Sequence, residues 1–308
     1  MKKSLIALAS LAVVTAASAQ SSVTLYGIAD VVIHKDTGSS LTMTSGGVST
    51  SRWGIKGSED LGGGLNANFN FEQSLDLTSG ATGSGFDRQA WVGLSGGFGE
   101  VKLGKAWNAY DDFAFAANSA FDANVLTPAI IAPSYDYVAN PNKGVYYATP
   151  DFGGFGAAIS TSFKDAADDN RRVTAYHVRY EAGPLFVAFG QERNKDDVNG
   201  TRTATRLVGS YDLGVATLRA GFGNVKSEGK DYSIGADVPL SDALTVSGGL
   251  VLVNPDVGSN RNALGLAVNY ALSKRTSVYT GFRSLNSAAV AATGEPKNRF
   301  GVGVKHEF

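Results

Sequence analysis

The last ten residues of the chain, RFGVGVKHEF (299–308), decide the kind of fold. Every second residue from Phe300 to the terminal Phe308 is apolar or amphipathic, and the residues between them are charged or glycine. This period of two predicts a β-strand with one apolar and one polar face. A soluble β-sandwich would show the same alternation. A strand that ends on phenylalanine is more typical of a sheet that faces lipid, which accepts the aromatic ring.

The first 19 residues have the pattern of a cleaved signal peptide. Lys2 and Lys3 form a short basic region, residues 5–15 are apolar, and residues 17–19 are a small-residue cleavage site. About 11 apolar residues are too few for a transmembrane helix, which needs about 20. We therefore expect residues 1–19 to be removed after export and residues 20–308 to form a single domain.

Composition excludes several classes of protein. The sequence has 38 glycines, 8 prolines and no cysteine, which excludes a disulfide scaffold and thiolate chemistry. Removing Lys2 and Lys3 leaves 25 basic and 28 acidic residues, a net charge of −3 that is not typical of a nucleic-acid-binding protein. No later stretch has the length and apolarity of a transmembrane helix, so a membrane location predicts a closed barrel.

Seven short glycine-, proline- or aspartate-rich turns punctuate the alternating stretches. They lie at 60–64, 96–99, 150–154, 182–184, 212–214, 239–242 and 272–275. The later turns are about 30 residues apart, which fits two strands of about 9–11 residues and one loop. If the seven turns and both chain ends lie on one side of the membrane, the chain forms eight hairpins of two strands each. We therefore predict an all-β protein, a 16-stranded antiparallel transmembrane β-barrel.

One interval, from Gly97 to Phe152, is too long for a single hairpin by about 20 residues. The excess lies between Trp107 and Lys143 and is rich in Phe, Tyr, Ile and Val. Because the wall of a barrel has no room for this apolar surface, we expect the third outer loop to fold into the lumen.

Strand alternation assigns side chains to the two faces of the wall. In LNANFNFE (65–72) the asparagines and Glu72 would face the lumen, and in SRWGIK (51–56) Arg52 and Lys56 would do so. In DRQAWV (87–92) we expect Arg88 to point inward and Trp91 outward. Near the start of the chain, four small or apolar residues are expected to form a closely packed interface: Gly27, Ala29, Val31 and Val32.

These stretches resemble the general trimeric porins of Gram-negative outer membranes. The matching segments are SVTLYG (22–27), SRWGIKGSEDLG (51–62), RQAWVGL (88–94), LSKRT (272–276) and the terminal Phe308. These segments are spread over the whole mature chain and occur in the same order as in members of the family. The resemblance implies an outer-membrane location, a 16-stranded barrel, a homotrimer and an inward-folded third loop.

The resemblance also implies a pore constriction in which basic wall residues face carboxylates on the inward loop. Arg52, Arg88 and Glu72 match wall positions of the family. Lys56 and Arg283 are added because the strand alternation points them inward and because they lie at a suitable height along the barrel. Asp111, Asp112 and Asp122 are the loop carboxylates, and Phe308 is the signal for the barrel assembly machinery. Residues 140–143 (NPNK) lack an arginine that relatives often carry, and Asp151 replaces their usual glutamate.

A channel for passive diffusion of ions and small hydrophilic solutes is the function that follows from the resemblance. Selection would rest on size and on the field across the constriction, with a weak preference for anions as in relatives with these arginines. Homotrimer subunits, outer-membrane lipid, lipopolysaccharide and the assembly machinery are the expected partners, with no nucleic acid and no cofactor. The residues DAADDN (165–170) read as an acidic outer loop that binds divalent ions bridging lipopolysaccharide.

Two other classes remain as alternatives: an outer-membrane barrel enzyme, such as a lipase or protease, and a soluble secreted β protein. GLSGG (93–97) fits the G-x-S-x-G pattern of a nucleophile elbow, but that motif requires a helix after the turn and another alternating strand follows here. His34, His177 and His306 are far apart and lack metal-ligand spacing. We therefore expect no enzyme activity and no metal site.

Overall fold

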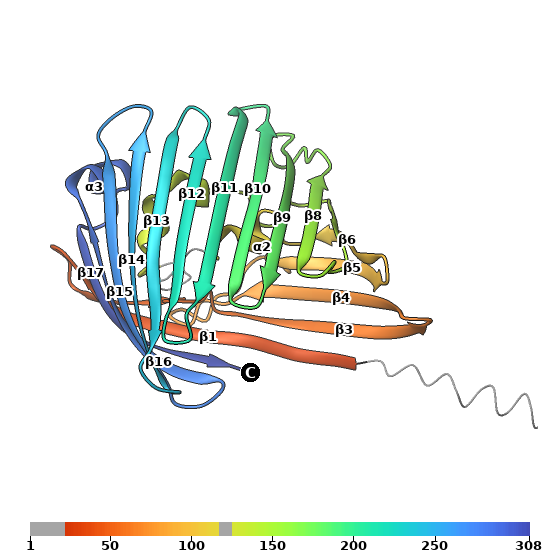
Figure 1. The fold of residues 1–308 in the computed structure, drawn as a ribbon, viewed down its shortest axis with the longest axis horizontal. Coiled ribbons are helices and arrows are strands. Elements are labelled where there is room, and N and C mark those ends of the chain that lie inside the picture. The colour runs from red at the N-terminus through yellow and green to blue at the C-terminus, as the bar shows by residue number, and fades with distance from the viewer. Residues whose placement is uncertain (1–21, 117–124) are drawn as a thin grey trace, which may run out of the picture.

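The computed structural model describes residues 22–116 and 125–308 as an almost entirely β protein (Figure 1). The predicted signal peptide, residues 1–19, lies outside the described residues. The strands are β1 (Ser22–Asp36), β2 (Leu41–Ser45), β3 (Arg52–Gly62), β4 (Leu65–Ser74), β5 (Gln89–Gly96), β6 (Gly99–Lys105), β7 (Gly144–Ala148), β8 (Phe155–Ser162), β9 (Arg172–Ala182), β10 (Leu185–Asp196), β11 (Gly200–Asp212), β12 (Thr217–Val225), β13 (Gly229–Pro239), β14 (Leu244–Pro255), β15 (Arg261–Ala271), β16 (Thr276–Leu285) and β17 (Asn298–Glu307).

Four short helical segments lie outside the strands: α2 (Asp111–Ala114), the 3₁₀ turns η1 (Pro128–Ile131) and η2 (Pro133–Tyr135), and α3 (Ser287–Thr293). Asn286 caps α3 by accepting a hydrogen bond from the Ala289 amide, and Gly294 ends the helix in the left-handed conformation. None of the helices in the described residues is long and apolar enough to cross a membrane.

The sheet closes on itself through β1. One edge of β1 pairs with β17, from Ile28 opposite Glu307 to Asp36 opposite Arg299. The other edge pairs first with β3 and then, nearer the β1–β2 hairpin, with β2. β2 and β3 therefore occupy one position in the wall, so the 17 strands form a closed 16-stranded antiparallel barrel, as predicted.

The chain terminus completes this closure. The Gly27 amide donates to the Phe308 carbonyl at 2.9 Å, and the Phe308 amide donates to the Gly27 carbonyl at 3.0 Å. A Cβ atom on Gly27 would lie 2.3 Å from the Phe308 ring, closer than atoms in proteins approach. Glycine is therefore required where the first strand meets the last residue.

The seven predicted turns are confirmed, and all join consecutive strands at one end of the barrel. The opposite, outer end carries connections of very different length. Residues 197–199 and 226–228 are tight hairpins, whereas residues 106–143 form the long connection between β6 and β7. Gly62, Gly63 and Gly64 all have positive φ in the first short turn, which explains that glycine run.

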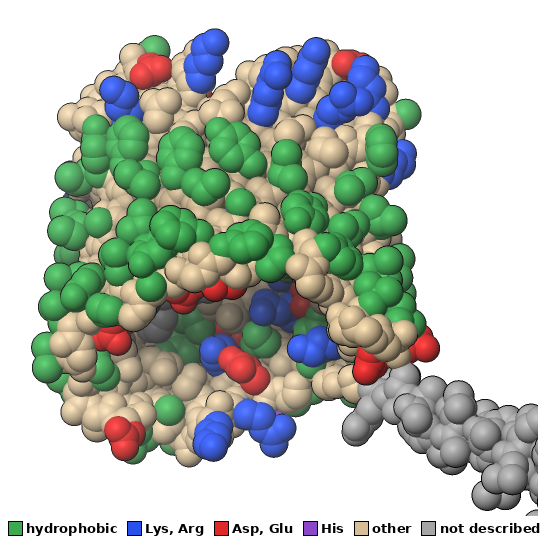
Figure 2. Space-filling model, turned by 45° about the vertical axis from the view of Figure 1, so that its right-hand side comes forward, with side chains coloured by type: hydrophobic (Ala, Val, Ile, Leu, Met, Phe, Trp, Pro, Cys, Tyr) green, Lys and Arg blue, Asp and Glu red, His purple; other side chains and the backbone are tan. Residues whose placement is uncertain are grey.

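The wall has an apolar outer face and a mixed inner face. Outward residues of β17 are large and exposed, with Phe300 and Val302 each 51% exposed, whereas the alternate Gly301 and Gly303 are buried. Figure 2 shows hydrophobic side chains in a band across one face of the wall, with Lys and Arg side chains at the upper rim and also toward the lower end. This arrangement suits a barrel that spans lipid.

One parity prediction is wrong. Trp91 pairs across β4–β5 with Asn70, so it faces the lumen, while Val92 is 58% exposed on the outer face. Arg88 does point inward, but it precedes the first residue of β5, and the bend there resets the alternation.

The four residues near the start of the chain that were expected to pack closely together do not share one face. Val32 is fully buried on the inner face against Tyr279 and Leu126, so it cannot belong to an interface on the outer face.

Candidate pore constriction

Glu72 on β4 holds a cluster of charged side chains on the inner wall. Its carboxylate accepts a hydrogen bond from Arg88 Nε at 2.7 Å and lies 3.5 Å from Arg52 Nε. The Tyr26 hydroxyl donates to the same carboxylate at 2.9 Å and approaches the Asn70 side-chain oxygen at 2.8 Å. Three predicted wall residues, Arg52, Glu72 and Arg88, are thus brought together.

The strand register explains this cluster. Gly54 stands opposite Glu72 in the β3–β4 ladder, and a Cβ atom on Gly54 would lie 2.7 Å from the Tyr26 ring. Glycine therefore leaves room for the tyrosine to reach Glu72. Two guanidinium groups share one carboxylate, so the cluster carries one net positive charge, which arginine keeps at any physiological pH.

Aromatic rings accompany the inner-wall cations. The Arg88 guanidinium lies 5.0 Å from the centre of the Trp107 ring, and Lys56 Nζ lies 5.1 Å from the Tyr26 ring. Lys56 is exposed and sits four residues from Arg52 toward the short turns, so it lines the inner wall below the cluster. These contacts are attractive because a cation interacts with the electron-rich face of an aromatic ring.

Sequence reasoning missed Lys102 on β6. Its register partner is Gly93, on the inner face, and its Nζ lies 2.9 Å from Glu100 and 4.7 Å from the Tyr146 ring. The alternation of Glu100 and Lys102 with Val101 and Leu103 carried the signal, because it assigns both charged side chains to the lumen.

The long connection between β6 and β7 is described for residues 106–116 and 125–143. Tyr110 and Phe113 are almost fully buried, and η1 and η2 contact strands β11 to β16, across the barrel from the strands that the connection joins. Buried Glu192 on β10 holds both of its ends, accepting hydrogen bonds from Asn108 Nδ2 and from the Val138 amide.

Arginines on the inner wall hold the middle of the connection. Arg206 forms a fully buried ion pair with Asp231 at 2.9 Å, and both groups bind the Ser134 hydroxyl. Three further inner-wall arginines donate to backbone carbonyl groups of the connection: Arg202 to Pro133, Arg219 to Ala116 and Arg299 to Val125. Carbonyl oxygens of the long connection, which have no strand partners, thereby find hydrogen-bond donors inside the barrel.

Two of the predicted loop carboxylates, Asp111 and Asp112, form hydrogen bonds with tyrosine hydroxyl groups. Asp111 accepts a hydrogen bond from the Tyr137 hydroxyl at 2.6 Å, and Asp112 accepts one from the Tyr146 hydroxyl at 2.7 Å. Burial raises the pKa of the Asp112 carboxyl, against the opposing effect of the Tyr146 hydrogen bond. Asp122 lies outside the described residues.

Arg283 points inward, as the strand alternation predicted, but it does not lie beside the Glu72 cluster. It is fully buried near the outer end of β16, and its Nη2 donates to Glu295 in the connection between β16 and β17 at 2.6 Å. Because this connection covers it, Arg283 does not line open water with Arg52 and Arg88.

The geometry gives little support to enzyme chemistry. Ser95 lies within β5, and a short turn leads from β5 into strand β6 rather than into a helix. His177 Nδ1 lies 3.6 Å from Asp112, but the same nitrogen donates to the Ala109 carbonyl at 2.7 Å. Within the described residues no group of three or more His, Cys, Asp and Glu side chains is placed to hold a metal ion.

The acidic outer residues 165–170 are also engaged within the protein. Asp165 accepts hydrogen bonds from Lys143 Nζ and Asn142 Nδ2, each at 2.9 Å, and these bonds lower the pKa of Asp165 to about 2. Asn170 Nδ2 donates to Asp197 at 2.7 Å. The Asp165 carboxylate is therefore used to fix the outer loop.

Comparison with known proteins agrees with the barrel fold. The family model described as Gram-negative porin matches residues 5–289. The chain is 34% identical to outer membrane porin protein 32 of Delftia acidovorans and 28% identical to major outer membrane protein P.IB of Neisseria meningitidis serogroup B, with full coverage of each pair. A solved anion-selective porin from Comamonas acidovorans superposes with a TM-score of 0.82 at 28% identity, covering 94% of this chain and all of that one.

The chain therefore belongs to the family of Gram-negative porins. It is an outer-membrane β-barrel that forms a channel.

Replacing Arg206 with methionine tests how the long connection is held. The change leaves Asp231 buried without its cation, and breaking a buried ion pair in this way costs about 3–5 kcal/mol. We expect a lower melting temperature in detergent and noisier single-channel current, because Asp231 loses its ion pair and Ser134 loses one of its two side-chain partners. The double variant Arg206→Met/Asp231→Leu should recover most of the melting temperature. A single variant that melts like the wild type would show that the ion pair does not hold the connection.

Proposed function

We propose that the lumen conducts ions and small hydrophilic solutes by passive diffusion, with a weak preference for anions. The cluster of Arg52, Arg88 and Glu72 carries this proposal, because its guanidinium groups are partly exposed and outnumber the carboxylate. Lys56 extends the positive wall toward the short-turn end, whereas Lys102 is paired there with Glu100. The long connection opposite, held by Glu192 and Arg206, is the element that narrows the lumen beside this wall.

The proposed mechanism combines size exclusion with a local field. An anion about 4 Å from one arginine gains on the order of 1 kcal/mol in water, and more where the walls exclude water. The mature chain has a net charge of −3, which opposes the local positive charge of the cluster, so the expected preference is weak. The Comamonas acidovorans porin with a similar structure is anion-selective, which supports the same sign.

The double variant Arg52→Ser/Arg88→Ser changes the cluster charge from +1 to −1. We expect a reversal potential shifted toward cations in a salt gradient and a higher single-channel conductance, because two large side chains leave the lumen. Glu72→Gln changes the charge in the opposite direction and should shift the reversal potential toward anions. Arg172→Ser, at an exposed position on the outer face of β9, is the control for loss of one positive charge.

The alternative role for the two arginines is structural: they neutralise Glu72 and stabilise the wall. In that case the double variant would keep the wild-type reversal potential while its melting temperature falls. That pair of results would remove the arginines from the selectivity mechanism.

We also propose that the chain forms homotrimers through the outer face around β1. Val23 and Leu25 on β1 and Leu41 on β2 are each more than 60% exposed there, and Ala29 adds a small side chain. The outer membrane protein OmpT of Vibrio cholerae, which superposes with a TM-score of 0.74 at 18% identity, has a solved trimer form. Light scattering with the detergent contribution subtracted should give three times the chain mass, and a monomer mass would contradict the proposal.

Phe308 is proposed as the residue that the barrel assembly machinery recognises, and lipopolysaccharide is proposed to surround the outer part of the wall. We expect Phe308→Ala to lower the outer-membrane yield severalfold while assembled channels keep their conductance, because the residue closes the β1–β17 seam away from the cluster. Phe300→Ala, which removes another exposed ring from β17, is the matched control. Equal yields for the two variants would refute a special role for the terminus.

A further inference from the structure

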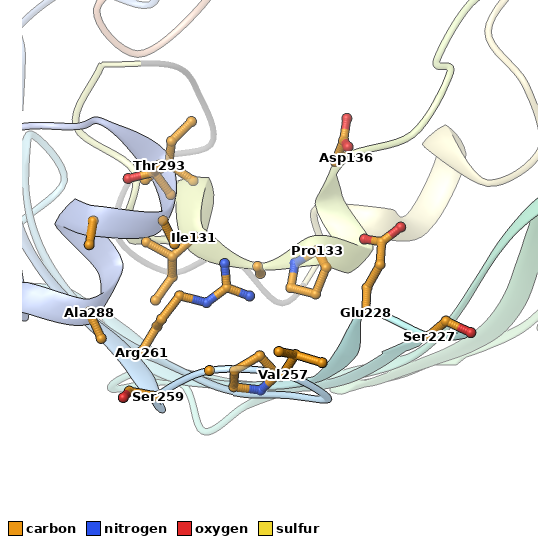
Figure 3. Close-up of a pocket in the computed structure, with 16 residues that line it drawn as sticks. Ile131, Pro133, Asp136, Ser227, Glu228, Val257, Ser259, Arg261, Ala288 and Thr293 are labelled. Carbon is orange, nitrogen blue, oxygen red and sulfur yellow. The ribbon is translucent and has the colours of Figure 1, made fainter. Parts of the chain in front are cut away.

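A pocket of about 760 Å³ lies at the outer end of the barrel. It is bounded by η1 and η2 of the long connection, by the connections that follow β12 and β14, and by α3 (Figure 3). Its size is in the range of small-molecule sites. The pocket is separate from the Glu72 cluster, which lies on β3, β4 and the start of β5.

Arg261, the first residue of β15, projects into this pocket (Figure 3). Its Nε is buried without a hydrogen-bond partner, and no ion pair joins its guanidinium to a carboxylate in the described residues. The other inward-facing arginines in the described strands each lie within 4.0 Å of an aspartate or glutamate: Arg52, Arg179, Arg202, Arg206, Arg219, Arg283 and Arg299. Arg261 therefore has an unused capacity to bind an anion.

The surroundings of Arg261 are largely apolar. Ile131 and Pro133 from the long connection, Val257 from the β14–β15 connection and Ala288 from α3 line the pocket around the guanidinium (Figure 3). The α3 sequence, SAAVAAT, presents alanines, which leave space that larger side chains would fill. An occupant that satisfies both features has an anionic group attached to an apolar body.

The far side of the pocket opposes a second negative charge. Glu228 and Asp136 lie there (Figure 3). Glu228 is paired with Arg202 at 2.6 Å, whereas Asp136 is 3.9 Å from Arg202 and its side chain is 89% exposed. A ligand with carboxylates at both ends would place one of them beside Asp136, where repulsion disfavours it.

We propose that this pocket binds amphipathic monocarboxylates at the outer mouth of the channel. The carboxylate accepts hydrogen bonds from the Arg261 guanidinium, and the apolar chain packs against Ile131, Pro133 and Ala288. The site selects one negative charge with an apolar tail, and it discriminates against dicarboxylates of the same length.

Hexanoate, adipate and hexan-1-ol test this proposal, because they share a six-carbon chain and differ in charge. Binding to the purified full-length protein in detergent is measured by saturation-transfer NMR and by titration calorimetry, with protein-free detergent as the blank. We expect hexanoate to bind about tenfold more tightly than either adipate or hexan-1-ol, a difference of the size expected for one charge-assisted hydrogen-bonding group.

Three variants locate the site. Arg261→Gln should weaken hexanoate binding about tenfold, whereas Arg261→Lys should retain part of it, because the charge stays and the planar fork is lost. Ala288→Leu should weaken hexanoate binding without a change in charge, by filling the apolar part of the pocket. Arg172→Gln removes an exposed arginine of the outer face and should bind hexanoate like the wild type.

The proposal is wrong if Arg261→Gln binds hexanoate as tightly as the wild type, or if adipate binds as tightly as hexanoate. Single-channel conductance of Arg261→Gln in potassium chloride is expected to equal that of the wild type. That readout separates this site from the proposed constriction, because hexanoate binding does not depend on the conductance or on its selectivity. If Arg261→Gln fails to fold, Arg261→Lys and Ala288→Leu still decide the outcome.

Discussion

The whole structure depends on the need to pair every backbone hydrogen-bonding group of a sheet that faces lipid. Hydrocarbon offers no partner, so the sheet must have no open edge. β1 meets this need on both sides, with β17 along one edge and β2 and β3 in succession along the other. The bonds between Gly27 and Phe308 extend the seam to the last residue of the chain.

Closure places two different environments on the two faces of each strand. Outward positions accept large apolar side chains, whereas the inner face carries alanine, glycine and charged groups. Charged groups on the inner wall serve two purposes. Glu192, Arg206 and Asp231 are buried and hold the long connection, which would otherwise leave backbone groups without partners. Arg52 and Arg88 stay partly exposed and contribute to the field in the lumen.

Local chemistry explains why much of the fold was predictable. Short turns depend on glycine, proline and aspartate within a few residues, so their number gave the number of strands correctly. Alternation placed Arg52, Lys56 and Glu72 on the inner face. It failed at Trp91, because the bend before β5 shifts the alternation by one residue. Arg88 lies before the first paired residue of β5 and still points inward. Alternation also places Val32 on the opposite face from Ala29, so the expectation that the two share one interface went against the pattern.

The sequence by itself determined the period-two strands, the seven turns and the amphipathic ending, because these signals are local. Together with the signal-peptide pattern they favour a closed barrel in a membrane. Only the tertiary structure decided which charges meet. Ser134 and Asp231 are 97 residues apart, and Arg261 lies beside η1 and α3 only because the barrel closes. Asp111 and Asp112 bind tyrosine hydroxyl groups. The physical reason is that hydrogen-bond partners across a lumen are set by strand register and loop path, which no local pattern encodes.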